Sequence, residues 1–238
     1  MFQTMDVLGA YIPYPWERAI AGPFVAGIAK QKKGDPETWA RLDSLAVRLS
    51  AAMNLPDGMK IKVHFVHDNK INAFATLGGN VIILDGLVAR MPNENALAMV
   101  VAHEIAHVKH RDVITAISAG LMFAAVAAVV LGDAGWAEEI ISGEGLLTTL
   151  HFSRKREKSA DEEALSALVK VYGHTGGFEE VFRVLDHASK GQKRPPALLS
   201  THPRIESRIA NLNKIAERNG WPVSGPMTPL VSKPEFLR

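Results

Sequence analysis

Two histidines stand four residues apart near the middle of the chain, in the segment VVAHEIAHVKHRD. Residues four apart lie on one face of an α-helix, so His103 and His107 would point the same way. Two imidazoles placed like this can bind one Zn²⁺ at about 2 Å each. Glu104, next to the first histidine, could then act as general base on the attacking water. This pattern indicates the chemistry of a metallopeptidase.

A histidine pair with this spacing is also common on the polar surface of a helix. Here the neighbouring side chains are apolar, which predicts a mostly buried helix: Val100, Val101, Ala102, Ile105, Ala106 and Val108. Two imidazoles and a carboxylate are costly to bury without a partner, and a metal ion supplies one. His110 does not fit the longer metzincin spacing. We expect it to contact solvent or the groups behind the ligands.

A catalytic zinc site uses three protein ligands and keeps one position open. The segment SRKREKSADEEAL offers Glu157 as the third ligand. Asp161, four residues later on the same face, could accept the N–H of a ligating histidine and fix its tautomer. The alternative is a solvated, charged helix, because several charged residues surround the pair. Spacing alone leaves both interpretations open.

The bulk composition limits the classes of protein that fit. A chain of 238 residues can bury a core as one domain or two small ones. A net charge of +2 without a dense Lys/Arg tract argues against nucleic acid as a partner. The absence of cysteine excludes disulfides and thiolate ligands, so His, Asp or Glu must hold any metal. The N-terminus lacks the basic and apolar regions of a secretory signal.

The periodicity of apolar residues predicts how these motifs are carried. Strands are expected in 59–68 and on either side of a turn at Gly78–Gly79, with the third strand in 81–84. Asn93 is the expected N-cap of the histidine helix. Helices are predicted within 34–55, 93–112, 147–173 and 176–191, and after the Pro-rich loop near 195. The Pro-rich tail from Trp221 is expected to be loosely held.

Residues 113–132 form an apolar stretch without any charged side chain. Their number reaches the lower range for a membrane-spanning helix. Many of them are alanine, so the stretch is only modestly apolar. We expect a buried or interfacial helix, with membrane insertion as the alternative.

Three motifs in this order are similar to those of a known family: AHEIAHVKHRD, SRKREKSADEEAL and STHPRIESRI. The segment NAFATLGGNVIILDGLV resembles the family's strand region ahead of the zinc helix. Together they resemble the HtpX-like gluzincins, metallopeptidase family forty-eight, which also includes BepA and the CAAX prenyl endopeptidases. The resemblance runs from about Trp39 to Leu212. It implies an α+β, mainly helical fold, in which a small antiparallel or mixed sheet lies beside the HExxH helix.

The resemblance also implies roles for particular residues. His103, His107 and Glu157 would bind one Zn²⁺ per chain, with Glu104 as general base. Asp161 would orient a zinc-binding histidine, and Arg208 would position the carboxylates. Asn72 and Ala73 would lie on an edge strand that binds a peptide by strand addition. His202 has two candidate roles: it could donate a hydrogen bond to the transition-state oxyanion, or it could occupy the open zinc position in a resting form.

The resulting hypothesis is a zinc-dependent endopeptidase that acts on protein substrates. By family analogy it would serve quality control in the bacterial cell envelope, either periplasmic or membrane-associated through 113–132 or an upstream anchor. The lack of clear membrane spans argues against CAAX-type processing. We expect residues 35–218 to form the peptidase domain, between an N-terminal extension (1–34) and a C-terminal tail (219–238).

Two alternatives belong to other functional classes. The domain could be a self-inhibited, chaperone-like module whose zinc site is closed by His202 and which binds unfolded chains with little turnover. It could instead be a membrane-associated interaction protein in which 113–132 is the working element. An aminopeptidase is a weaker alternative among the enzymes, because an edge strand open at both ends favours internal cleavage.

Overall fold

The computed structural model describes residues 12–29, 36–118, 152–190, 196–202 and 205–230. Its α-helices are α2 (Tyr14–Ala29), α3 (Pro36–Ala52), α4 (Asp85–Val88), α5 (Glu94–Lys109), α9 (Arg154–Tyr172), α10 (Phe178–Ser189), α11 (Ala197–Thr201) and α12 (Ile205–Arg218). Its strands are β1 (Lys62–Val66), β2 (Ala73–Thr76) and β3 (Asn80–Leu84). The predicted α+β, mainly helical fold is therefore confirmed. The predicted strands and helices are present, although the helix expected from 147 begins at Arg154 and 147–151 lie outside the described residues, and α2 was not predicted.

The sheet has the order β1-β3-β2, with β1 parallel and β2 antiparallel to β3. A short 3-10 turn, η2 (Leu77–Gly79), joins β2 to β3, and both of its glycines have positive φ. Residues alternate in β1, so Val63 and Phe65 share one face of the sheet, and both are buried. His64 and Val66 on the opposite face are buried as well, because the second face of the sheet carries its own small apolar cluster.

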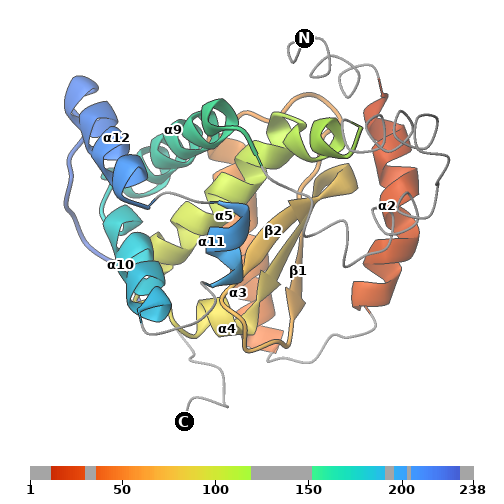
Figure 1. Ribbon diagram of the computed structural model, residues 1–238, viewed down its shortest axis with the longest axis horizontal. Helices are drawn as coiled ribbons and strands as arrows, with labels where there is room; N and C mark the ends of the chain where they lie inside the picture. The colour runs from red at the N-terminus through yellow and green to blue at the C-terminus, as the bar shows by residue number, and fades with distance from the viewer. Residues whose placement is uncertain (1–11, 30–35, 119–151, 191–195, 203–204, 231–238) are drawn as a thin grey trace, which may run out of the picture.

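Helix α5 is the centre of the fold, and Figure 1 shows it crossing the molecule between the sheet and α9. Every side chain from Asn95 to Val108 is buried. The helix packs most extensively against α9, and also against α3, α10 and β2. Its N-terminus is capped as expected, because the Asn93 side chain accepts a hydrogen bond from the Ala96 N–H at 2.9 Å. The two histidines therefore lie on a helix that is enclosed by its neighbours.

The expectation of a loosely held tail is wrong for residues 221–230. The Thr228 N–H donates to Asn95 Oδ1 at 2.9 Å, and the Thr228 carbonyl accepts from the Glu94 N–H. Farther back, the Pro222 carbonyl accepts a hydrogen bond from the Thr175 N–H. The proline content removes regular secondary structure from the tail but leaves its carbonyls free to pair with the body of the protein.

Most of the apolar stretch 113–132 lies outside the described residues. Its beginning is helical, and Val113 and Ile114 are buried. Within the part of the chain that the structure describes, no helix combines the length and the apolar character needed to span a bilayer. The choice between a buried and a membrane-inserted segment stays a prediction.

Replacing Asn93 with alanine should lower the free energy of unfolding by about 1–2 kcal/mol, because α5 loses its N-cap. Urea-induced unfolding followed by circular dichroism measures the change. Asn93→Ser is the matched control: serine keeps a capping oxygen but loses the amide that donates to Glu180 Oε2 at 2.5 Å. An equal loss in both variants would assign the effect to the Glu180 contact and contradict the capping argument.

Candidate active site

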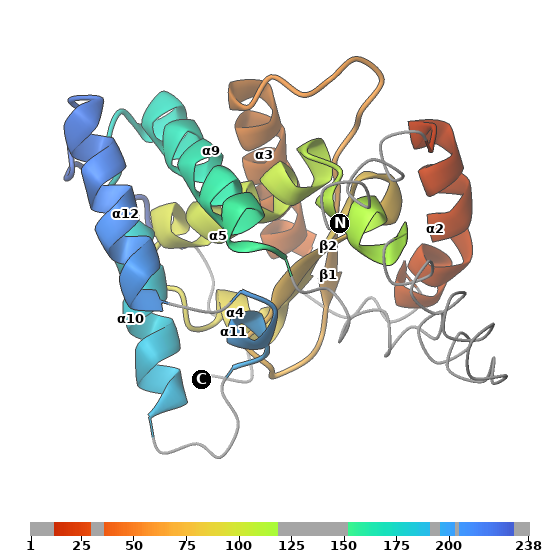
Figure 2. The ribbon, with the colours of Figure 1, turned by 45° about the horizontal axis from the view of Figure 1, so that its top comes forward.

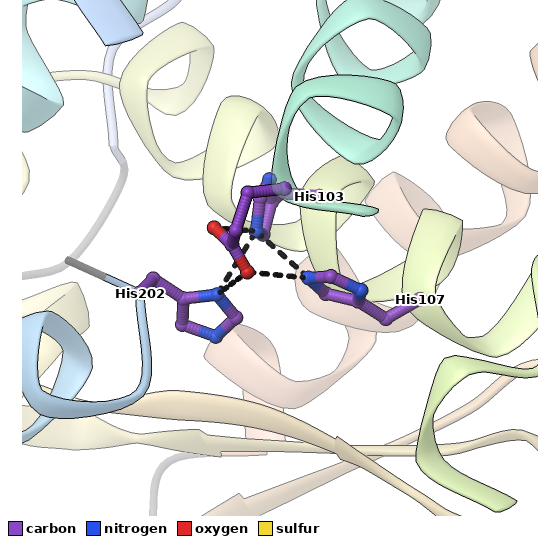
Figure 3. Close-up of side chains that lie close together, drawn as sticks. His103, His107 and His202 are labelled. Carbon is purple, nitrogen blue, oxygen red and sulfur yellow. Dashed lines mark hydrogen bonds and ion pairs between the residues drawn. The ribbon is translucent and has the colours of Figure 1, made fainter. Parts of the chain in front are cut away.

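Four buried side chains bring potential metal ligands together at the centre of the molecule. His103 and His107 come from α5, Glu157 from the first turn of α9, and His202 from the residue after α11. The ligand atoms of these four residues lie within 4.8 Å of one another. Figure 3 shows the three labelled imidazoles converging from α5 and from the chain beyond α11. The structure thus brings together residues separated by up to 99 positions.

The two α5 histidines direct their Nε2 atoms at each other. These atoms lie 3.0 Å apart, while the Nδ1 atoms face carboxylates: His103 Nδ1 is 3.0 Å from Asp161 Oδ1, and His107 Nδ1 is 2.8 Å from Asp112 Oδ2. In a neutral imidazole one nitrogen donates and the other accepts. If both Nδ1 atoms donate to carboxylates, both Nε2 atoms present lone pairs to the same point. A cation at that point removes the resulting repulsion.

Asp161 lies behind His103, with Asp161 Oδ1 3.0 Å from His103 Nδ1, an arrangement that the spacing allowed and the family resemblance implied. Arg208 of α12 contacts this carboxylate through two nitrogens, at 2.9 and 2.7 Å. Burial alone would raise the pKa of Asp161, but the Arg208 guanidinium and His103 outweigh burial and lower it to about 2. Asp161 therefore stays ionised and can hold the proton on His103 Nδ1.

Asp112 has the same role behind His107, and the sequence reasoning missed it. The chain leaves α5 through Arg111, a non-glycine residue with a φ of 59°, and this left-handed turn brings Asp112 back toward His107. Arg156 of α9 contacts the other carboxylate oxygen of Asp112 at 3.4 Å. Phe152 stacks on the His107 ring with centroids 4.1 Å apart. The only signal in the sequence was the acidic residue shortly after the second histidine.

Glu104 is 1% exposed, and its two carboxylate oxygens have different surroundings. Oε2 accepts a hydrogen bond from the Ala75 N–H at 2.7 Å. Oε1 is buried, has no hydrogen-bond partner and lies 3.5 Å from His202 Nε2. Burial raises the pKa of this carboxyl above its ordinary value. A carboxylate with a raised pKa and one free oxygen is suited to accept and return a proton.

His202 points its Nδ1 atom into the same cluster. This atom is 2.8 Å from Glu157 Oε1 and 3.2 Å from His103 Nε2. The Arg208 Nη1 group donates to the carbonyl of His202 at 3.3 Å, which connects the loop to α12. His110, by contrast, is not part of the cluster and faces Glu163, with His110 Nε2 2.6 Å from Glu163 Oε2.

The two predicted substrate-binding residues are in different situations. The carbonyl of Asn72, just before β2, accepts from the Leu84 N–H at 3.1 Å, so it is used inside the sheet. Paired and unpaired residues alternate along an antiparallel strand, which turns the main chains of Ala73 and Ala75 toward the free edge. The Ala75 N–H meets Glu104 there. Ala73 therefore fits strand addition, and Asn72 does not offer its main chain for it.

The residues of this cluster fit a zinc ion. A tetrahedral site with metal–nitrogen distances near 2 Å places its ligand atoms about 3.3 Å apart. For five of the six residue pairs the separation of potential ligand atoms is 2.8 to 3.6 Å, and all four ligand atoms lie within 4.8 Å of one another. Glu157 Oε2 is buried without a hydrogen-bond partner. The imidazoles of His103 and His107 and the carboxylate of Glu157 match the ligand types of catalytic zinc, and His202 is near the remaining position.

A helix carrying HExxH, a buried carboxylate from a second helix close to its two histidines and a small sheet beside them are the features of a zinc metallopeptidase domain of the gluzincin class. The profile of Peptidase family M48 matches residues 36–216, and the chain belongs to this family. Members of the family are zinc-dependent, which confirms the expected cofactor and enzyme class. The resemblance seen in the motifs is thereby confirmed.

Individual relatives are similar over most of this chain. The β-barrel assembly-enhancing protease of Escherichia coli is 31% identical over 203 residues, which are 77% of this chain and 40% of that protein. The mitochondrial metalloendopeptidase OMA1 of Schizosaccharomyces pombe is 29% identical over 70% of this chain and 50% of its own length. A protease HtpX homolog from Desulfatibacillum aliphaticivorans is 29% identical over 83% and 76%. The chain thus spans less than half of the E. coli relative.

Replacing Asp112 with alanine should weaken zinc binding by about 10- to 100-fold, because His107 loses the acceptor that fixes its tautomer. Competition with a chromogenic zinc chelator measures the affinity. Asp43→Ala, an exposed position on α3, is the control and should bind zinc as the parent does. Unchanged affinity in Asp112→Ala would mean that His107 is oriented without this carboxylate.

Proposed function

We propose that this domain is a zinc endopeptidase that hydrolyses peptide bonds within protein substrates. The observation that carries the proposal is the state of Glu104. Its carboxylate is buried against the ligand cluster, one oxygen is held by the Ala75 N–H, and the other faces the cluster without a hydrogen-bond partner. A residue with a purely structural role would have both oxygens satisfied.

The proposed mechanism assigns one task to each residue. His103, His107 and Glu157 would hold the zinc ion, which would polarise the scissile carbonyl and acidify water. Glu104 Oε1 takes a proton from the attacking water and returns it to the leaving amine. Asp161 and Asp112 would keep the two histidines in the tautomer that presents each Nε2 lone pair to the ligand cluster. His202, once moved off the ligand cluster, could donate through its ring to the developing oxyanion.

Substrate would bind along the free edge of β2. The main chain of Ala73 faces that edge, and an extended peptide could pair with it as an added strand. Beside Glu104 and His202 lies a recess with mostly apolar walls, formed by Met99, Val100, Val181, Phe182, Leu185 and Leu198. An apolar substrate side chain next to the scissile bond would fit this recess.

The cellular role we propose is quality control of envelope proteins. The name of the E. coli relative refers to assembly of β-barrels, and the other similar proteins include a protease HtpX homolog. The proposal extends to a location in the bacterial cell envelope, with membrane association through 113–132 or an upstream anchor. It rests on family analogy rather than on the geometry of the site.

Zinc content and cleavage, measured on the same variants, test the enzyme. We expect the parent to hold one zinc ion by elemental analysis and to cleave casein. Glu157→Ala should lose the metal, because two histidines alone bind it weakly. Glu104→Gln should keep zinc and lose cleavage by at least about 100-fold, because the proton acceptor is gone. A parent that binds no added zinc, or a Glu104→Gln variant that cleaves at the parental rate, would refute these roles.

A second function is favoured by the position of His202. Its Nδ1 reaches into the ligand cluster, 3.2 Å from His103 Nε2, and would compete with substrate for the metal. In the same segment the Leu198 N–H already donates to the Ile71 carbonyl, just before the free-edge strand β2. Both contacts fit a resting domain with its site closed. Such a domain would be a self-inhibited, chaperone-like module that binds unfolded chains with little turnover.

Replacing His202 with alanine separates the two roles of this residue. If His202 closes the site, the variant should keep zinc and cleave casein several-fold faster than the parent. If His202 stabilises the oxyanion, cleavage should fall by roughly 100- to 1000-fold with zinc retained. His187→Ala, at an exposed histidine of α10, is the matched control. An unchanged rate in His202→Ala would exclude both roles.

A further inference from the structure

Helix α2 lies outside the region matched by the family profile, yet it contacts the segment that follows the zinc helix. Figure 2 shows α2 at the end of the molecule opposite α10 and α12, beside the chain that continues from α5. The contact is made by Glu17, a carboxylate that is only 5% exposed. An ionised group buried to this degree needs charged or hydrogen-bonding partners.

Glu17 has two such partners from different parts of the fold. Its Oε1 accepts from Arg111 Nε at 2.8 Å and from Arg111 Nη2. Its Oε2 accepts from the Gly78 N–H at 3.4 Å, in the turn that follows β2. The carboxylate therefore joins the end of the zinc helix to the end of the edge strand.

The packing around Glu17 is close enough to fix its position. A Cβ on Gly78 would lie 2.8 Å from the Arg18 Cα, so only glycine leaves room for α2 at this turn. A Cβ on Gly79 would collide with the Tyr14 hydroxyl and the Lys60 carbonyl. Helix α2 thus packs against the Gly78–Gly79 turn, which also connects β2 to β3.

The partner that matters for the metal site is Arg111. Its φ of 59° lies in the left-handed region, which is unfavourable for a residue with a side chain. This conformation brings Asp112 to His107, with 2.8 Å between Asp112 Oδ2 and His107 Nδ1. Two contacts hold the Arg111 guanidinium in place: Glu17 Oε1 accepts from its Nε and Nη2, and the Ile12 carbonyl accepts from Nη2. Of these two partners, only the Glu17 carboxylate is charged.

We propose that Glu17 is a positioning residue for the zinc site: through Arg111 it holds the turn that places Asp112 against His107. The inference rests on the proposed function, because it assumes that His107 is a zinc ligand. Helix α2 then becomes part of the machinery that retains the metal. Removing the Glu17 contact would weaken zinc retention, although Glu17 contacts none of the ligands.

The test is a double-mutant cycle read out by zinc release. The zinc-loaded proteins are mixed with excess 4-(2-pyridylazo)resorcinol, and the release rate is followed by absorbance. Glu17→Gln, which keeps the size of the side chain but removes its charge, should release zinc about three- to tenfold faster than the parent, at or below the lower end of the effect expected for a direct partner of a ligand. Glu37→Ala, which breaks the exposed ion pair with Arg41 on α3, should match the parent.

The second arm uses Arg111→Gly, since glycine adopts a positive φ without strain. This variant should form the turn without help, so adding Glu17→Gln to it should not change zinc release further. The absorption bands of the Co²⁺-substituted proteins report ligand geometry. They should shift in the Glu17→Gln single variant, but not when Glu17→Gln is added to Arg111→Gly. Should Glu17→Gln fail to fold by circular dichroism, Arg111→Lys replaces it, because lysine keeps the charge but loses the two-nitrogen contact.

Parental release by Glu17→Gln, or an equal acceleration in both backgrounds, would overturn the inference. The first result would mean that the turn holds without Glu17, and the second that Glu17 acts by a route other than Arg111. A parent that retains no zinc would refute the proposed function itself, and the inference with it. The two failures are therefore distinguishable.

Discussion

The structure depends on one constraint, which is that two imidazole nitrogens are held 3.0 Å apart inside the protein. As long as both imidazoles are neutral and give their Nδ1 protons to carboxylates, neither Nε2 atom can donate a proton to the other. The rings cannot rotate away, because α5 is buried along nearly its whole length. The surrounding helices have to supply what the pair lacks: a carboxylate in front of the rings, acceptors behind them, and the Arg208 guanidinium that lowers the pKa of Asp161.

Sequence patterns predicted the parts of this arrangement that lie within one helix. The spacing of His103 and His107 sets their common face, and the same rule applies to Glu157 and Asp161 on α9. Which helix meets which is a property of the fold, and here the resemblance to family motifs supplied the missing step. The contact between Asp112 and His107 was not predicted, because it depends on a left-handed turn at Arg111. An arginine in a sequence gives no indication of positive φ.

Sequence patterns also failed to predict which main-chain groups are left free by strand pairing. The segment around Asn72 and Ala73 was correctly placed at the edge of the sheet, but the free main chain belongs to Ala73 and Ala75. Register determines this alternation, and a shift by one residue would reverse it. The tail shows a related limit, since its prolines predict the absence of helix and strand but say nothing about which partners its carbonyls find.

Charge balance connects the ligand cluster to the arginines around it. Among the described residues of the site, four carboxylates are buried: Glu104, Asp112, Glu157 and Asp161. Arg208 and Arg156 contribute two positive charges, so two negative charges remain when all four acids are ionised and the histidines are neutral. A divalent cation neutralises these two charges. The pKa of His107 points in the same direction: burial alone would lower it, yet Asp112 and Glu157 raise it to about 9. The site therefore favours a positive charge at the point where the two Nε2 atoms meet. A zinc ion there would neutralise the two remaining negative charges and accept both Nε2 lone pairs.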